Sequence, residues 1–287
     1  MPTDFDPSFQ ITNWSWWIVL YFFVGGIAGG IYFGAAWLDL FGESVDRGAM
    51  RIGHLLAFPL IIVSAVFLAV DLGQPLRFWH MIFQSENFPL PIFKAYSPMS
   101  FGSAILAAFG LFSFLSFIDA LFGHNHWLHA GPVGKVISVL GALTGLALAG
   151  YTGVLLNVGN EPVWGDSPWI SALFLFSGIS TGLAALILVT RRSPTVEKLS
   201  EADSYMMVFE LVILVVFLAT LGAVGARFIF GSPTLILFAV VFVVCLILPL
   251  AFHFWLRSAS AVSGVLVLIG GFVLRWAVLA GPQGIGL

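Results

Sequence analysis

Eight long apolar stretches constrain the fold of this chain more than any other feature of its sequence. A helix that crosses about 30 Å of hydrocarbon needs about 20 predominantly apolar residues, and such stretches occupy most of the 287 residues. Charged residues make up only 9% of the chain, against roughly 25% in a soluble domain. The sequence therefore predicts an all-α integral membrane protein with eight transmembrane helices. We expect the spans near 14–41, 50–71, 98–122, 134–156, 168–190, 203–228, 232–256 and 259–280.

The connections between these spans predict a single membrane domain over residues 1–287. Most are short and rich in turn-forming residues, so we expect two packed four-helix bundles, 14–156 and 168–280. Only the connection at 72–97 is long, and its aromatic residues and prolines are not typical of a flexible linker. This segment predicts a surface against which another protein packs. The glycines at 25–30 form two overlapping small-xxx-small patterns, which predict close contact with neighbouring helices.

The distribution of positive charge predicts the orientation in the membrane. An even number of spans puts both termini on one side, and the positive-inside rule places the side with more Lys and Arg in the cytoplasm. Both termini and the 72–97 loop are therefore expected outside, in a prokaryotic cytoplasmic (inner) membrane. The first apolar stretch is too long for a signal peptide, so we expect it to be retained. Seven of the 11 cationic residues lie on the predicted inner side: Arg47, Arg51, Lys135, Arg191, Arg192, Lys198 and Arg257.

The composition excludes several classes of site. A net charge of −3 with no basic arm argues against nucleic-acid binding. Cys245 is the single cysteine, so the chain has no internal disulfide, no cysteine-based zinc site and no iron–sulfur cluster, which typically needs about four thiolates. Any electrons must therefore come from elsewhere. His124, His126 and His129 are spaced like metal ligands but have no carboxylate or cysteine nearby, so we predict a solvated loop and no metal site.

Four residues are expected near the outer ends of the early spans. Asp71 ends the second span, and a charged group at a membrane boundary is a functional candidate, with a structural ion pair to Arg77 or Arg275 as the alternative. Tyr151 lies between one and two turns from the outer end of the fourth span, where a phenol suits a quinone carbonyl or an interfacial aromatic belt. Asn13 and Trp17 begin the first span at the same depth.

Three further ionisable residues lie within the spans. Glu210 is expected about two turns from the inner end of the sixth span, and His54 at a similar depth in the second. Arg275 is expected in the outer part of the eighth span, where it would neutralise Asp71 or a quinone headgroup. These residues suggest a proton path, and buried structural hydrogen bonding is the alternative. His54 and His253 also leave open one haem b with two histidine ligands.

Several short motifs, in order, carry a family resemblance. They are the segment at 17–30, DLGQPLRFW at 71–79, SPMSFG at 97–102, YTGVLL at 151–156, and PVW at 162–164 followed by Leu173 and Phe174. Each motif alone is weak, but their order and spacing are specific. From about residue 14 to 280, the chain resembles the NrfD/PsrC family, the polysulfide reductase membrane subunit.

This resemblance implies a haem-free, eight-helix anchor that exchanges electrons between membrane quinone, either menaquinone or ubiquinone, and a partner. The implied partner is a ferredoxin-like subunit with several iron–sulfur clusters, docked on the outer side through loop 72–97, often with a molybdopterin enzyme beyond it. The implied quinone site lies in the first four helices. The family's aspartate and tyrosine match Asp71 and Tyr151. We place Asn13, Trp17 and Arg77 at the same site, and His54, Glu210 and Arg275 on a proton path.

Two other classes of function remain alternatives. A proton-coupled secondary transporter would use Asp71, Glu210 and His54 as coupling residues and have no redox partner. The lack of clearly broken spans at matching positions in the two halves counts against it. A purely structural anchor would tolerate Tyr151→Phe and Asp71→Asn without loss of electron transfer.

Overall fold

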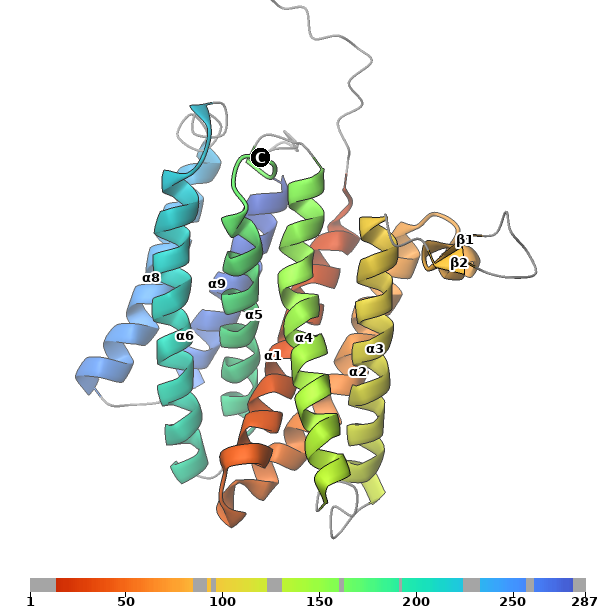
Figure 1. Cartoon of the computed structure of the whole chain (residues 1–287). Coiled ribbons are helices and arrows are strands. Elements are labelled where there is room, and N and C mark those ends of the chain that lie inside the picture. Colours follow the sequence, from red (N-terminus) through yellow and green to blue (C-terminus); the bar gives the residue numbers. More distant parts are fainter. Residues whose placement is uncertain are drawn as a thin grey trace, which may run out of the picture.

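The computed structural model describes residues 14–84, 92–93, 97–122, 131–159, 163–190, 193–223, 233–256 and 261–280. In this part of the chain, eight long α-helices stand side by side (Figure 1). Seven are long and apolar enough to cross a membrane, and α8 contains the apolar segment Phe242–His253. The predicted all-α membrane fold is confirmed. The helices are α1 (Trp16–Phe41), α2 (Arg47–Asp71), α3 (Pro98–Phe122), α4 (Pro132–Val158), α5 (Trp169–Val189), α6 (Ser193–Ala219), α8 (Pro233–Leu256) and α9 (Ala261–Ala280).

Helix packing places α1 and α5 at the centre of the molecule. In the first half, α1 contacts α2 and α4, and α3 closes the ring by contacting both of these. In the second half, α5 contacts α6 and α9, while α8 contacts α6 and α9. The two halves meet because α5 packs directly against α1 and α4. We call the end with the start of α1 and the end of α2 the outer end, and the opposite end the inner end.

The long connection after α2 has local structure at the outer end. It contains the 3-10 helix η2 (Pro75–Met81) and two short strands, β1 (Phe83–Gln84) and β2 (Ile92–Phe93). The strands pair antiparallel, with Phe83 opposite Phe93, and they lie beside the start of α3 (Figure 1). Gly73 has φ +65°, a left-handed conformation that suits the glycine after a helix C-terminus. The second helix ends at Asp71, as predicted.

The glycines of α1 allow close contact with two different helices, as predicted. An added Cβ at Gly29 would lie 2.6 Å from the Gly145 carbonyl oxygen of α4. An added Cβ at Gly30 would overlap the Gly178 carbonyl oxygen of α5. One small-xxx-small pattern therefore faces α4 and the other faces α5. Small residues let membrane helices pack with their backbones nearly in contact.

The sixth helix begins ten residues earlier than predicted, at Ser193 rather than near residue 203. Ser193 and Pro194 are residue types typical of a turn, but proline is also well tolerated in the first turn of a helix, where its missing N–H has no intrahelical partner. The polar residues Glu197, Lys198 and Glu201 follow in this first part of α6. These polar residues lower the mean hydropathy of the first part of α6. A search for apolar spans therefore did not detect this part of the helix.

A buried carboxylate joins the turn between α1 and α2 to the start of α6. Asp46 lies in the 3-10 helix η1 (Ser44–Asp46) and is fully buried. Its carboxylate accepts hydrogen bonds from the Glu43 backbone N–H at 2.9 Å, the Thr195 hydroxyl at 2.7 Å and Lys198 Nζ at 3.0 Å. These bonds compensate the cost of burying the charge. They also hold the Lys198 side chain at the inner end of the molecule.

Candidate functional site at the outer end

A cavity of about 110 Å³ at the outer end is lined by both Asp71 and Tyr151. It lies among α1, α2, α3 and α4 and the residues just before α1. Apart from the Asp71 carboxylate and the hydroxyls of Tyr21, Ser103 and Tyr151, its walls are apolar and aromatic. This composition is typical of small-molecule sites, which combine apolar walls with a few polar groups. The apolar and aromatic contributors include Trp14, Ile18, Tyr21, Leu68, Met99 and Leu155.

Asp71 is held by the start of α1. The Ser15 hydroxyl donates a hydrogen bond to Asp71 Oδ1, and Ser15 Oγ accepts one from the Trp17 backbone N–H at 3.2 Å. Ser15 is thus the N-cap of α1 and also the contact between α1 and the end of α2. The partial positive charge at the N-terminus of a helix stabilises a neighbouring carboxylate. The chain therefore holds the Asp71 carboxylate at the outer end without an ion pair to Arg275.

Tyr151 is positioned by the first turn of α3. Its hydroxyl donates a hydrogen bond to the carbonyl oxygen of Pro98. One turn later, a Cβ added at Gly102 would overlap the Tyr151 ring, so only glycine leaves room for this side chain. Residues of the SPMSFG motif therefore fix the phenol in the wall of the cavity. The motif alone did not predict this contact, because Pro98 and Tyr151 are 53 residues apart in the sequence.

Tyr151 also lines a second, more open hollow of about 810 Å³ between α3, α4 and α5. The walls of this hollow are almost entirely apolar and include Phe101, Ile105, Val154 and Leu175. The cavity that contains Asp71 and the apolar hollow therefore meet at one side chain. An amphipathic molecule with a polar ring and an apolar tail would find the two environments next to each other.

The other residues predicted at this site lie elsewhere. Trp17 packs against Phe67, with ring centroids 5.7 Å apart, and its side chain is not among those lining the cavity. Arg77 is exposed on η2 and does not line the cavity either. Asn13 lies outside the described residues. The structure thus brings together Asp71 and Tyr151, and adds Trp14, whose position at the start of the first span indicates only an interfacial aromatic residue.

Arg275 belongs to a buried polar cluster in the second half of the molecule. It is 1% exposed, and its guanidinium donates to the Ser177 hydroxyl at 3.1 Å and to the Gly271 carbonyl at 2.8 Å. Glu210 also hydrogen-bonds the Ser177 side chain. Arg275 is therefore placed to balance the charge of Glu210 rather than that of Asp71. Depth along a helix, which the sequence provides, does not show which neighbour a side chain faces.

Sequence reasoning missed one member of this cluster, Asp203. It is buried on α6 and accepts a hydrogen bond of 2.7 Å from Ser180 of α5. Asp203 and Glu210 are seven residues apart, about two helical turns, so they lie on the same face of α6. This seven-residue spacing of two acidic residues is the sequence feature that could have indicated Asp203.

His54 lies apart from this cluster. Its ring packs edge-on against Tyr32 of α1 at 5.0 Å, and the Tyr32 hydroxyl lies 2.7 Å from that of Ser116 on α3. The predicted inner group of His54 and Glu210 is therefore not assembled, because the two side chains face different halves. His253, on α8, is 3.1 Å from the Ser200 hydroxyl of α6, and α8 and α2 lie on opposite sides of the bundle (Figure 1). The structure does not bring His54 and His253 together as a haem ligand pair.

Comparisons with known proteins agree with the fold and motifs. A sequence model of the family described as "Polysulphide reductase, NrfD" matches residues 7–285. The chain belongs to the NrfD family. The protein named NrfD of Escherichia coli K12 is 26% identical, over 96% of each chain. An NrfD homologue of Haemophilus influenzae is 24% identical over 99% of each chain. The C subunit of the polysulfide reductase of Wolinella succinogenes is 26% identical over 63% of this protein and 59% of its own length.

The PVW motif, one of the motifs on which the family resemblance was based, lies between α4 and α5. Val163 has φ +75°, which is unfavourable for a β-branched residue. Trp164 is fully buried, and its indole N–H donates a 2.6 Å hydrogen bond to the Val278 carbonyl of α9. Its ring also lies 5.4 Å from that of Trp14 in the cavity wall. This motif therefore packs behind the cavity wall and does not line the cavity.

Among the described residues, no group of three or more His, Cys, Asp or Glu is arranged to hold a metal ion.

Proposed function

We propose that this chain is the quinone-reactive membrane subunit of a respiratory oxidoreductase. The observation that supports this most strongly is the placement of Asp71 and Tyr151 in one cavity with mainly apolar walls. The residues fit a quinone headgroup, because a carboxylate and a phenol supply a proton acceptor and a hydrogen-bonding hydroxyl. The apolar hollow beside Tyr151 suits an isoprenoid tail. Menaquinone and ubiquinone both have this chemistry.

A bound quinone would supply two-electron, two-proton redox chemistry, and the residues of the cavity would handle the protons. The Asp71 carboxylate accepts a proton when a quinol is oxidised and returns it in the reverse reaction. The Tyr151 hydroxyl already donates to Pro98, and its oxygen accepts a hydrogen bond from the Gly102 backbone, so one lone pair is left to accept a hydrogen bond from a quinol hydroxyl. Donation to a quinone carbonyl requires the hydroxyl to turn away from Pro98. The apolar walls limit access of water to the reacting atoms.

Binding of a quinol analogue tests this proposal directly. The fluorescent inhibitor 2-heptyl-4-hydroxyquinoline N-oxide should bind the purified protein with a stoichiometry of about one, and its fluorescence should be quenched. We expect Tyr151→Phe and Asp71→Asn each to weaken binding by about 10-fold, the usual cost of one lost hydrogen bond to a charged or polar partner. Trp17→Phe, outside the cavity, is the matched control. Absence of binding to the unaltered protein would refute the proposal and would favour the transporter alternative.

Electrons would pass between this site and a partner protein docked at the outer end. We infer an iron–sulfur subunit, followed by a further catalytic subunit, which the family resemblance implies to be a molybdopterin enzyme. The support from the structure is an exposed apolar surface on η2, where Leu76 is 90% exposed and Phe78 and Trp79 are also exposed. Large exposed apolar side chains beyond the membrane are typical of protein interfaces. The proposed location is the prokaryotic cytoplasmic (inner) membrane, with both termini outside.

Co-purification tests the docking surface. The tagged protein, extracted from its native membrane in mild detergent, should carry a cysteine-rich, multi-cluster protein in stoichiometric amount. Leu76→Asp with Phe78→Asp should remove that protein, because two charges would then enter an apolar interface. Glu201→Gln is the control, because it changes an exposed residue at the inner end, away from the docking surface. A partner retained by the double variant would show that docking lies elsewhere.

The buried Arg275, Glu210 and Asp203 support a second, dependent proposal: a proton path through the second half of the molecule. The assignment of His54 to the same path stays a prediction, since it packs in the first half. Proton uptake by proteoliposomes that turn over quinol would test it. Glu210→Gln should reduce uptake and leave electron transfer intact; if uptake is unchanged, the cluster is structural.

A further inference from the structure

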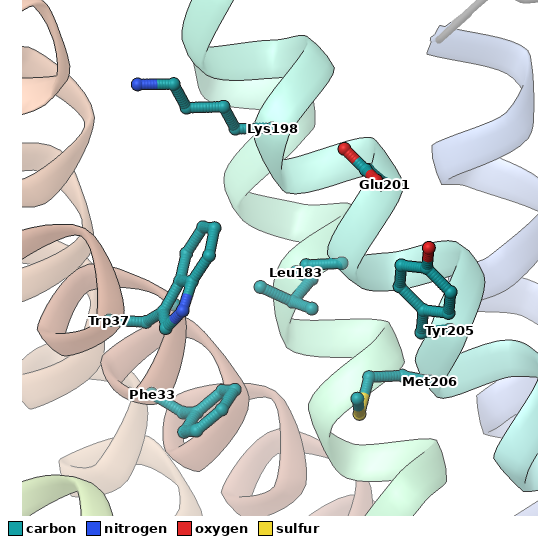
Figure 2. A pocket seen from close by; sticks show the side chains of 9 residues that line it. Phe33, Trp37, Leu183, Lys198, Glu201, Tyr205 and Met206 are labelled. Carbon is teal, nitrogen blue, oxygen red and sulfur yellow. The ribbon is translucent and has the colours of Figure 1, made fainter. Parts of the chain in front are cut away.

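A third hollow, of about 370 Å³, lies near the inner end between α1, α5 and α6, on the far side of the membrane from the Asp71 cavity. Figure 2 shows the side chains that surround it. Lys198 and Glu201 lie at one end, and Phe33 and Met206 lie at the other, with Trp37, Leu183 and Tyr205 between them. The hollow is therefore amphipathic along its length. We call it the inner groove.

The charged end of the inner groove carries both signs. Lys198 Nζ lies 3.0 Å from Asp46 and 3.5 Å from Glu43, and its side chain is 34% exposed. An ammonium group has three N–H donors, so one remains for a ligand after these two contacts. Glu201 is exposed three residues further along α6. The positive charge of Lys198 is offset by Asp46 and Glu43, so the rim as a whole does not favour a purely anionic group.

The groove runs from its charged end to its apolar end over less than the thickness of one leaflet of the bilayer. Lys198 and Met206 are eight residues apart on α6, about 12 Å at 1.5 Å per residue. The hydrocarbon of one leaflet is about 15 Å thick, half of the bilayer core. Tyr205 is 56% exposed near the middle of the groove. An acyl chain that follows the groove from Lys198 would thus stay within its own leaflet.

We propose that the inner groove binds one phospholipid of the inner leaflet with a zwitterionic, amine-bearing headgroup, such as phosphatidylethanolamine. Its phosphate contacts the free N–H of Lys198, and its ammonium contacts the Glu201 carboxylate. One acyl chain lies along Phe33, Leu183 and Met206. The groove lies between α1 and α6, which have no extensive direct contact with each other, so the lipid fills the gap where these helices meet α5. This proposal does not depend on quinone binding at the outer end.

Photo-crosslinking of the full-length protein in nanodiscs tests the proposal. The probe is phosphatidylethanolamine with a diazirine in one acyl chain, and crosslinked peptides are identified by mass spectrometry. We expect crosslinks in both α1, near Phe33 and Trp37, and α6, near Met206. Phosphatidylglycerol with the same diazirine group should give fewer crosslinks at these positions. Equal labelling by both lipids, or labelling that is lost on adding menaquinone, would overturn the proposal.

Three variants make the test specific. Ala202→Trp places a large ring in the groove and should abolish crosslinks there. Val212→Trp, on the same helix but outside the groove, replaces a side chain that is 53% exposed; it is the size-matched control and should retain the crosslinks. Glu201→Lys changes only an exposed rim charge, so it should fold normally and reverse the preference toward phosphatidylglycerol. If Glu201→Lys leaves the preference unchanged, the headgroup assignment is wrong.

Discussion

Replacing Asp71 with asparagine should lower quinone-linked electron transfer by about 10²- to 10⁴-fold, the usual contribution of a positioned acid or base. Asparagine keeps the size of the side chain and still accepts the hydrogen bond from Ser15. It has no carboxylate to accept and return a proton. We therefore expect the variant to assemble with its partner and to lose turnover. The measurement is oxidation or reduction of a soluble quinol analogue by the isolated complex.

Tyr151→Phe is the companion to this experiment, because it removes one oxygen and keeps the ring that packs against Gly102. We expect a loss of turnover in the same direction, with a smaller effect than that of Asp71→Asn, because a hydrogen bond is lost rather than a proton acceptor. Trp17→Phe should keep the unaltered rate, since Trp17 does not line the cavity. Activity of the partner with an artificial electron donor or acceptor serves as the assembly control. Normal quinone turnover in both cavity variants would mean that the anchor is purely structural.

The second large effect is expected from a single glycine at the centre of the helix packing. Gly30→Ala adds one methyl group where the backbones of α1 and α5 meet at Gly178 and Gly182. The overlapping atoms belong to backbones of two buried helices, so no flexible side chain can move aside. We expect a loss of about 3 kcal/mol in stability, at the upper end for overpacking. Gly30→Leu should prevent recovery of folded, monodisperse protein from detergent.

Gly110 provides the matched control for these variants. It also lies within a transmembrane helix, α3, but an added Cβ there would meet no atom within 4 Å. Gly110→Ala and Gly110→Leu should therefore be recovered as well as the unaltered protein, with the same thermal transition. Equal stability of Gly30→Ala and Gly110→Ala would show that α1 and α5 are not in close contact.

The apolar runs alone predicted eight membrane helices, because about 20 consecutive apolar residues have few other stable environments. The structure adds that Gly73, just after α2, has the left-handed conformation that glycine takes most readily. The paired glycines of α1 indicated close helix contacts, since a residue without a Cβ allows backbones to approach. The start of α6 was missed because a hydropathy search identifies only the apolar part of a helix. The polar first part of α6, which extends beyond the membrane, is not apolar enough to be detected.

The candidate site shows what can be predicted from the sequence and what depends on the tertiary structure. Counting residues along the helices placed Asp71 and Tyr151 at one depth, and the structure shows that both line the same cavity. The same counting placed Arg275 near Asp71, yet the arginine faces Ser177 and the Phe22 carbonyl oxygen instead. The sequence by itself determined the apolar spans and the depth of Asp71 and Tyr151 along them, because these depend on local composition. Only the tertiary structure decided which groups meet, because the rotation of each helix about its axis is set by packing against its neighbours.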